Sequence, residues 1–241
     1  MKTLQKMRWI NSPHIRTIHG FSTRHGGVSP NPFDSLNLGG VDDLPENISV
    51  NRRRALDDLG IDMNQLSFLN QIHSNQVCLA KVGKQTGDAL VTNQKNIAIA
   101  VGAADCYPIL FYDEMNKVIG AAHCGWKGTL GRIVKNTIDE MVNLGAEIDH
   151  IKLAIGQGIS EKNYEVSEEV IQQFRDQHFP ETCWNNRHLD LLAANKFVAE
   201  ESGILKKHTW YMNRCTTEPD FFSYRRDHGK TGRMWAVIML K

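Results

Sequence analysis

The segment from Ile97 to Gly128, IAIAVGAADCYPILFYDEMNKVIGAAHCGWKG, decides the fold of this chain. It holds three apolar runs of strand length, at residues 97–102, 108–112 and 118–122. These runs are continuous rather than alternating, which is typical of strands covered on both faces. Polar or reactive side chains follow directly after two of the runs. The segment therefore predicts a buried sheet with chemistry at one edge.

Similar apolar runs recur outside this segment, at residues 15–21, 66–72, 76–82, 151–155 and 234–240. Helical spacing predicts four helices, at residues 48–59, 129–144, 167–177 and 189–202. The first, second and fourth of these are followed by a glycine, which favours helix termination. Strands come in runs and helices do not strictly alternate with them, so we expect an α+β fold with mixed sheets. No linker-like stretch divides the chain, which predicts a single domain over residues 1–241.

The composition argues against several classes of protein. A formal net charge of +1 gives no global field that would draw the chain to nucleic acid or to a membrane surface. Five cysteines at irregular spacing do not indicate a disulfide framework. Residues 1–8 lack the apolar run of a signal peptide, and residues 97–104 are too few to span a bilayer. We expect a cytoplasmic protein that binds neither nucleic acid nor membrane, with its oligomeric state left open.

Three side chains that suit a metal ion, His73, Cys106 and His123, stand where predicted strands end. A thiolate and two imidazoles form a donor set for Zn²⁺, with Cu²⁺ as a competitor. Three protein ligands leave a fourth position for water or substrate, and water on such a zinc ionises near neutral pH. Their spacing matches no local metal motif, so each residue could equally be an ordinary buried or surface side chain.

The same atoms fit a second chemistry that needs no metal. Cys106 could be a nucleophile deprotonated by His123, with Asp105 or a more distant carboxylate orienting the imidazole. Cys124 is not expected to be a ligand, because neighbouring side chains on a strand point to opposite faces.

Further positions are candidate contacts for an anionic substrate. Trp126 and Lys127 lie in a glycine-flanked turn that leads from a strand into a helix, where backbone amides and a lysine charge can bind an anion. The alternative is an ordinary strand-to-helix turn. Arg24 opens a polar loop at residues 24–40, which we expect to be an ordered active-site loop.

Two further arginine-containing segments, at residues 221–227 and 52–54, are interpreted separately. Arg225 lies in FFSYRRD, residues 221–227, where aromatic faces and guanidinium groups could stack a base and hold an anion. The alternative is a strand edge with solvated arginines. The cluster at residues 52–54 lies within a predicted helix and is interpreted as a solvated face.

Taken together, these motifs resemble the YfiH-like family, whose members are variously called multicopper polyphenol oxidases (laccases) and purine nucleoside phosphorylases. The matching pieces occur in family order from about residue 19 to the C-terminus. They are FSTRHGGV at 21–28, DSLNLG at 34–39, QIHS at 71–74, GDALVT at 87–92, ADCYP at 104–108, HCGWKG at 123–128, YEV at 164–166, CT at 215–216, FSYRR at 222–226 and TGRM at 231–234.

The resemblance implies that His73, Cys106 and His123 bind one zinc ion in a cytoplasmic enzyme. The implied fold is α+β, with mixed sheets sandwiched between helices. The implied substrates are purine nucleosides and phosphate: phosphorolysis of adenosine, inosine, guanosine and methylthioadenosine, and deamination of adenosine.

Within that reading, Arg24, Lys127 and Arg225 are the candidates for holding phosphate, and Asp105 is the candidate proton carrier. The chain departs from the family pattern at three places. Lysine stands at 127 where arginine is usual, cysteine stands at 124 in place of alanine, and no proline follows Gly156. The first departure keeps the charge but loses bidentate geometry, which weakens the expected phosphate contact there.

Three other functions stay open from the sequence. One is a metal-free Cys-His hydrolase that acts on a peptidoglycan precursor. Another is a copper-dependent polyphenol oxidase, although a single three-ligand site matches multicopper chemistry poorly. The third is a binding protein with a structural zinc, against which the lack of an evident fourth ligand argues.

Overall fold

The computed structural model of the chain describes residues 8–40 and 42–241. The N-terminal stretch that lacks a signal-like apolar run lies outside the described residues, apart from Arg8. Within the described part, no helix combines the length and the apolar character needed to cross a membrane.

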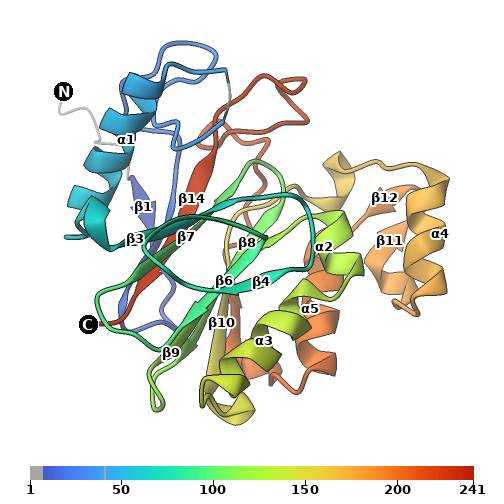
Figure 1. The fold of residues 1–241 in the computed structure, drawn as a ribbon. Helices are drawn as coiled ribbons and strands as arrows, with labels where there is room; N and C mark the ends of the chain where they lie inside the picture. The colour runs from blue at the N-terminus through green and yellow to red at the C-terminus, as the bar shows by residue number, and fades with distance from the viewer. Residues whose placement is uncertain (1–7, 41) are drawn as a thin grey trace.

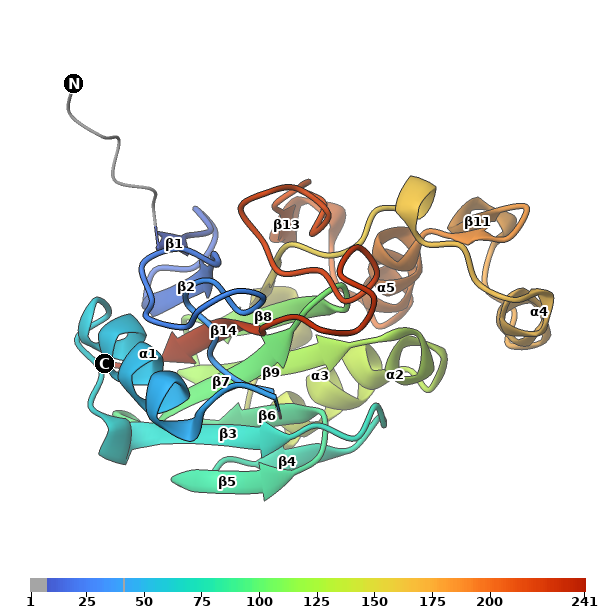
Figure 2. The same ribbon diagram turned by 90° about the horizontal axis from the view of Figure 1, so that it is seen from above.

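Two six-stranded mixed sheets form the centre of the molecule (Figures 1 and 2). The first sheet has the strand order β1 (Trp9–Ile10), β2 (Ile18–Ser22), β14 (Met234–Met239), β7 (Ala98–Ala103), β3 (Leu66–Asn70), β5 (Gly83–Thr86). The second has the order β13 (Thr209–Tyr211), β10 (Ile151–Ile155), β8 (Tyr107–Asp113), β9 (Val118–Cys124), β6 (Ala89–Thr92), β4 (Val77–Leu79). A small two-stranded sheet pairs β11 (Trp184–Asn185) with β12 (His188–Leu189).

The two large sheets pack face to face and helices cover their outer faces. The buried layer between the sheets includes Ile99 of β7 and Leu110 of β8. Helix α1 (Pro45–Asp57) packs on the outer face of the first sheet. Helices α3 (Ile133–Asn143) and α5 (Leu191–Glu201) pack on the outer face of the second sheet (Figure 1). The predicted α+β fold, with mixed sheets between helices, is confirmed.

The helix predicted over residues 129–144 is two helices. α2 (Trp126–Leu130) ends at Gly131, and α3 begins after Arg132, whose φ of 61° is left-handed. A tertiary contact accompanies the break, since the Asn75 amide donates to the Gly131 carbonyl at 2.8 Å. Local apolar spacing carries no information about that contact.

The remaining predicted elements agree with the structure to within a few residues, and several strands were missed. Helix α4 (Glu168–Asp176) matches its prediction, and the glycines after α1, α3 and α5 all adopt positive φ. The short strands β1, β5, β11, β12 and β13 were not predicted, nor was β6. Several of them lie at sheet edges, where partly exposed residues lack a strong apolar pattern.

Candidate metal centre

The three predicted metal ligands converge in space. One donor atom each from His73, Cys106 and His123 lie within 4.8 Å of one another, and the two imidazole rings stand edge to face with centroids 4.9 Å apart. His73 follows β3, Cys106 lies in the turn from β7 to β8, and His123 is near the end of β9. These ends meet because β3 and β7 run parallel, while β8 and β9 pair antiparallel with Pro108 opposite His123.

Asp88 is the residue that sequence reasoning missed. Its buried carboxylate accepts hydrogen bonds from the backbone amides of Ile72, His73 and Ser74, at 3.2, 3.1 and 2.7 Å, and from the Ser74 hydroxyl at 2.7 Å. It also lies 2.9 Å from Nδ1 of His123. With Nδ1–H bound to this carboxylate, Nε2 of His123 is the nitrogen that could bind a metal after losing its proton.

A sequence signal for Asp88 did exist. A lone aspartate stands directly before the apolar run Ala89–Val91, inside a motif shared with the family. Nothing local shows that the carboxylate is buried, and the side chain has 0% exposure. A buried carboxylate must be matched by donors, and here they come from a metal ligand and the turn that carries another.

The electrostatics of the cluster favour a thiolate. Burial opposes charge on Cys106, but the positive charge of His123 and hydrogen bonds from both histidines lower the pKa of its thiol. Burial also opposes charge on His123, but the Cys106 charge and the Asp88 hydrogen bond raise its pKa. The thiolate form is the one that binds metals or acts as a nucleophile.

Gly125 leaves room beside the ligands. A Cβ at this position would lie 3.0 Å from Sγ of Cys106 and 3.3 Å from Cδ2 of His73. Its φ of −81° is open to any residue, so the absence of a side chain serves the close approach rather than the backbone conformation. Cys124 is fully buried in the core.

Asp105, the predicted proton carrier, has both carboxylate oxygens engaged. Oδ1 accepts from the Thr216 hydroxyl at 2.5 Å, and Oδ2 accepts from the backbone amide of Arg225 at 2.7 Å. The residue is buried and has a φ of 88°. These contacts tie two points of the loop between β13 and β14 to the turn that carries Cys106, which favours a positioning role over proton transfer.

Two of the residues predicted to contact an anion are poorly suited to it: Arg24 is already bound to Asp34, and Lys127 lies at a weak anion site. Nε of Arg24 donates to the Asp34 carbonyl at 2.6 Å, its Nη2 forms an ion pair with the Asp34 carboxylate at 3.1 Å, and its guanidinium lies over Phe222. Arg24 therefore holds its own ordered loop together. Lys127 is exposed with Nζ above the Trp126 ring, and α2 has only five residues, so the predicted helix N-terminal anion site is weak.

In the loop after β13, the exposed residues Tyr224 and Arg225 are better candidates for contacting a substrate than the two phenylalanines before them. Phe221 and Phe222 are fully buried and therefore cannot stack a base. Tyr224 is 54% exposed. Arg225 is exposed, donates to the Glu165 carbonyl at 2.8 Å and lies over the Tyr164 ring. The segment is an irregular loop rather than a strand edge.

Of the arginines at residues 52–54, the first does not belong to a solvated face. Arg52 lies over the rings of Phe68 and Trp235, each 4.9 Å away, and donates to the Leu38 carbonyl. Arg53 is exposed, in line with its interpretation.

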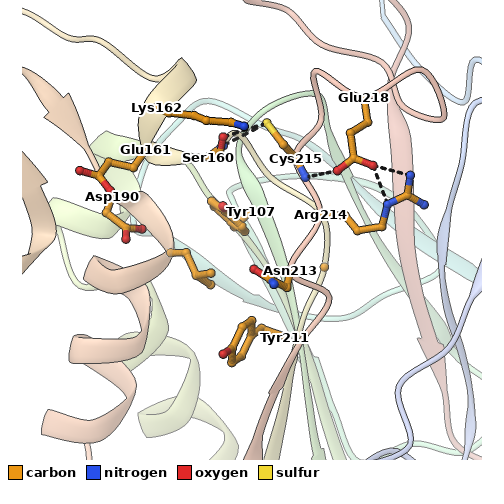
Figure 3. Close-up of a pocket in the computed structure, with 12 residues that line it drawn as sticks. Tyr107, Ser160, Glu161, Lys162, Asp190, Tyr211, Asn213, Arg214, Cys215 and Glu218 are labelled. Atoms are coloured by element: carbon orange, nitrogen blue, oxygen red, sulfur yellow. Dashed lines mark hydrogen bonds and ion pairs between the residues drawn. The ribbon is translucent and has the colours of Figure 1, made fainter.

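A separate pocket of about 420 Å³ lies beside the ends of β10 and β13 (Figure 3). Cys215 lies in its wall, and its sulfur accepts hydrogen bonds from the backbone amide and hydroxyl of Ser160, both at 3.2 Å. The adjacent Thr216 joins this wall to Asp105. The lining includes none of the three clustered ligands.

Comparisons with known proteins identify the family. A family model described as multi-copper polyphenol oxidoreductase laccase matches residues 18–241. A purine nucleoside phosphorylase from Deinococcus radiodurans is 46% identical over 235 residues, covering 96% of this chain and 92% of that protein. Adenosine deaminase RL5, from an unknown prokaryotic organism, is 31% identical over 267 residues, with full coverage of both. The crystal structure of YlmD from Geobacillus stearothermophilus matches with a TM-score of 0.93 at 30% identity, covering 99% of this chain and 98% of that one. The resemblance inferred from the motifs is confirmed, and the chain belongs to the multi-copper polyphenol oxidoreductase laccase family.

Proposed function

We propose that the chain is a zinc-dependent purine nucleoside enzyme, which phosphorolyses adenosine, inosine, guanosine and methylthioadenosine and deaminates adenosine. The observation that carries the proposal is the convergence of His73, Cys106 and His123, with His123 oriented by Asp88. The names of the relatives, purine nucleoside phosphorylase and adenosine deaminase, support the substrate class.

The donor chemistry fits a single zinc ion. One thiolate and two imidazoles, with a carboxylate behind one imidazole, form the combination that zinc sites use. Among residues 8–40 and 42–241, one group of this kind is found. Chemistry that uses several coppers needs more ligand sets than that, so copper is the less suitable resident. When bound, zinc would polarise a substrate oxygen or lower the pKa of a water molecule.

The protein groups around the cluster have distinct tasks in this proposal. Asp88 keeps Nδ1 of His123 protonated and directs Nε2 to the metal. Tyr164 is protonated at neutral pH like an ordinary phenol, and burial and the nearby Cys106 charge raise its pKa further, so its O–H can donate to a substrate. Arg225, over the Tyr164 ring, places positive charge at the substrate side.

Phosphorolysis and deamination require different contributions from these protein groups. In phosphorolysis, a phosphate oxygen bonds to C1′ of the ribose while the bond from C1′ to the base breaks, and the base leaves with the electron pair. The site must therefore hold an anion beside developing positive charge. In deamination, water adds to C6 of adenine and ammonia leaves, so the groups need only orient a neutral base and a water molecule.

One observation also favours a metal-free Cys-His hydrolase. Cys106, His123 and Asp88 have the order of nucleophile, base and orienting carboxylate, and the thiol pKa is lowered. The hydrogen bonds that Asp88 makes to the turn at 72–74 explain the carboxylate equally well in the zinc proposal. In the hydrolase, the task of His73 would be limited to stabilising the Cys106 thiolate.

Two measurements on one preparation test the proposal. Protein purified without added metal is assayed for zinc and copper, and is incubated with inosine plus phosphate, or with adenosine, for product analysis by mass spectrometry. We expect about one zinc per chain, and formation of hypoxanthine with ribose 1-phosphate, or of inosine. The Cys106→Ala variant should lose both zinc and turnover; a variant that keeps full zinc would refute the assignment.

The same preparation separates the rivals. Turnover of a peptidoglycan precursor by metal-free protein would favour the hydrolase. Phenol oxidation that depends on added copper, and that stops on chelation while nucleoside turnover persists, would mark the oxidase activity as adventitious. Phenol oxidation without nucleoside turnover would favour the polyphenol oxidase.

A further inference from the structure

Arg233 lies beside the turn that carries Cys106, although it was not among the predicted site residues. In the antiparallel pair of β14 and β7, Met234 stands opposite Ala103. One step further along each chain, Arg233 therefore lies next to Ala104, at the start of the turn that leads to Cys106. The backbone amide of Arg233 donates to Oδ1 of Asn37 at 2.9 Å, which fixes its position against the ordered loop at residues 24–40.

The guanidinium of Arg233 is partly buried without a carboxylate partner among residues 8–40 and 42–241. Its Nη1 donates to the carbonyls of Thr231 and Gly232 at 2.9 and 3.0 Å, and the guanidinium lies over the Tyr224 ring. Burying a guanidinium is costly unless an anion compensates it. Arg214 and Arg226 on the neighbouring segment satisfy that requirement with carboxylates.

The positive charge of Arg233 also interacts electrostatically with charges in and around the metal centre. Burial lowers the pKa of its guanidinium, whereas the charges of Cys106, Asp105 and Asp42 raise it. Arg225, on the same loop, likewise has no carboxylate partner in the described chain and lies over Tyr164. Two arginines without a carboxylate ion pair in the described chain thus adjoin the turn at residues 104–106, Arg233 through the pairing of β14 with β7 and Arg225 through its backbone amide, which donates to Asp105.

We infer that Arg233, together with Arg225, anchors inorganic phosphate beside the His73–Cys106–His123 cluster. The inference rests on the proposed function and adds Arg233 to the candidate phosphate contacts, of which Arg24 is already paired with Asp34. A planar guanidinium donates two parallel hydrogen bonds to a tetrahedral oxyanion, which a lysine at position 127 cannot do. The ligand class is a phosphate oxyanion.

The first experiment measures phosphate dependence. In Arg233→Gln, the KM for phosphate in inosine phosphorolysis should rise at least about tenfold, as expected for loss of a charge-assisted hydrogen bond. The KM for inosine should change by less than about threefold, and Arg233→Lys should be intermediate. Arg53→Gln, on an exposed face of α1, is the matched control and should behave as wild type. An unchanged KM for phosphate in Arg233→Gln would overturn the inference while leaving the proposed function intact.

The second experiment needs neither turnover nor a variant. Wild-type protein is treated with phenylglyoxal, which modifies accessible arginines, with inorganic phosphate or with chloride at equal ionic strength, and the adducts are mapped by mass spectrometry. Phosphate should protect Arg233 and should not protect Arg53. Equal modification of Arg233 in both salts, or no modification in either, would overturn the inference. Protection in a protein that does not turn over nucleosides would support the phosphate anchor and refute the proposed function.

Discussion

Replacement of Asp88 by asparagine tests the residue on which the metal centre depends. The carboxylate accepts five hydrogen bonds, from the amides of residues 72–74, the Ser74 hydroxyl and Nδ1 of His123. An amide keeps one oxygen, and its NH₂ group then faces donors that have no other acceptor. If the NH₂ faces His123, the imidazole must accept at Nδ1 and carry its proton at Nε2, where the metal would bind.

The magnitude follows from the pKa of Asp88. Burial raises this pKa, but hydrogen bonds from His123 and Ser74 and the charge of His123 bring it down from 3.8 to about 2. At 1.36 kcal/mol for each pKa unit, these interactions stabilise the folded chain by roughly 2 to 3 kcal/mol at neutral pH. The affinity for zinc should fall about 10-fold to 100-fold, as is usual when the partner of a ligating histidine is lost.

The pH dependence has a defined sign. Because the folded-state pKa of Asp88 lies below 3.8, its contribution is complete above about pH 4 and is lost as the pH falls toward about 2. Urea unfolding of metal-free protein at several pH values should show wild type exceeding Asp88→Asn by about 2 to 3 kcal/mol at pH 7. The difference should shrink below pH 4.

Asp113→Asn provides the matched control. Asp113 is equally buried and accepts hydrogen bonds from the amides of Met115, Asn116 and Glu147, but it lies at the opposite end of β8 from Cys106. This variant should lose stability and keep its zinc affinity, measured by competition with a chromophoric chelator. The reasoning is refuted if Asp88→Asn binds zinc like wild type, or if its stability deficit does not vary between pH 7 and pH 3.

Two further substitutions probe the surroundings of the cluster. Gly125→Ala places a methyl group 3.0 Å from Sγ of Cys106 and 3.3 Å from His73. Zinc occupancy after dialysis should therefore fall severalfold, while the thermal unfolding temperature of the metal-free protein changes little. Equal zinc occupancy in the variant and in wild type would show that the ligands can move aside without weakening zinc binding. Thr216→Val removes the 2.5 Å hydrogen bond to Asp105, which should cost about 1 to 2 kcal/mol in urea unfolding and reduce kcat, with zinc content retained; loss of zinc instead would place Asp105 in the metal centre itself.

The sequence predicted the central strands well because their signal is local. Residues 97–122 form three continuous apolar runs, and β7, β8 and β9 follow them closely. Polar edge strands such as β5 were not predicted, because the partly exposed residues there form no continuous apolar run. The break between α2 and α3 was not predicted, because apolar spacing shows neither the left-handed conformation of Arg132 nor the contact of Gly131 with Asn75, which is distant in sequence.

The sequence indicated each of the three ligands separately, but it did not show that they lie close together in space. Each of His73, Cys106 and His123 follows or ends an apolar run, yet their distances depend on strand order and register in two different sheets. Motif resemblance could join them because it carries information about the whole fold. Arg233 escaped for the same reason, since its proximity to Cys106 follows from the pairing of β14 with β7.

The arrangement links folding to metal binding through one carboxylate. Asp88 closes the turn that bears His73 and also orients His123, so any change that loosens this turn acts on two of the three ligands at once. Cys106 is placed independently, by the turn that carries the chain from the first sheet to the second and that Asp105 ties to the loop between β13 and β14. Metal binding should therefore stabilise the contact between the two sheets, because its ligands come from both.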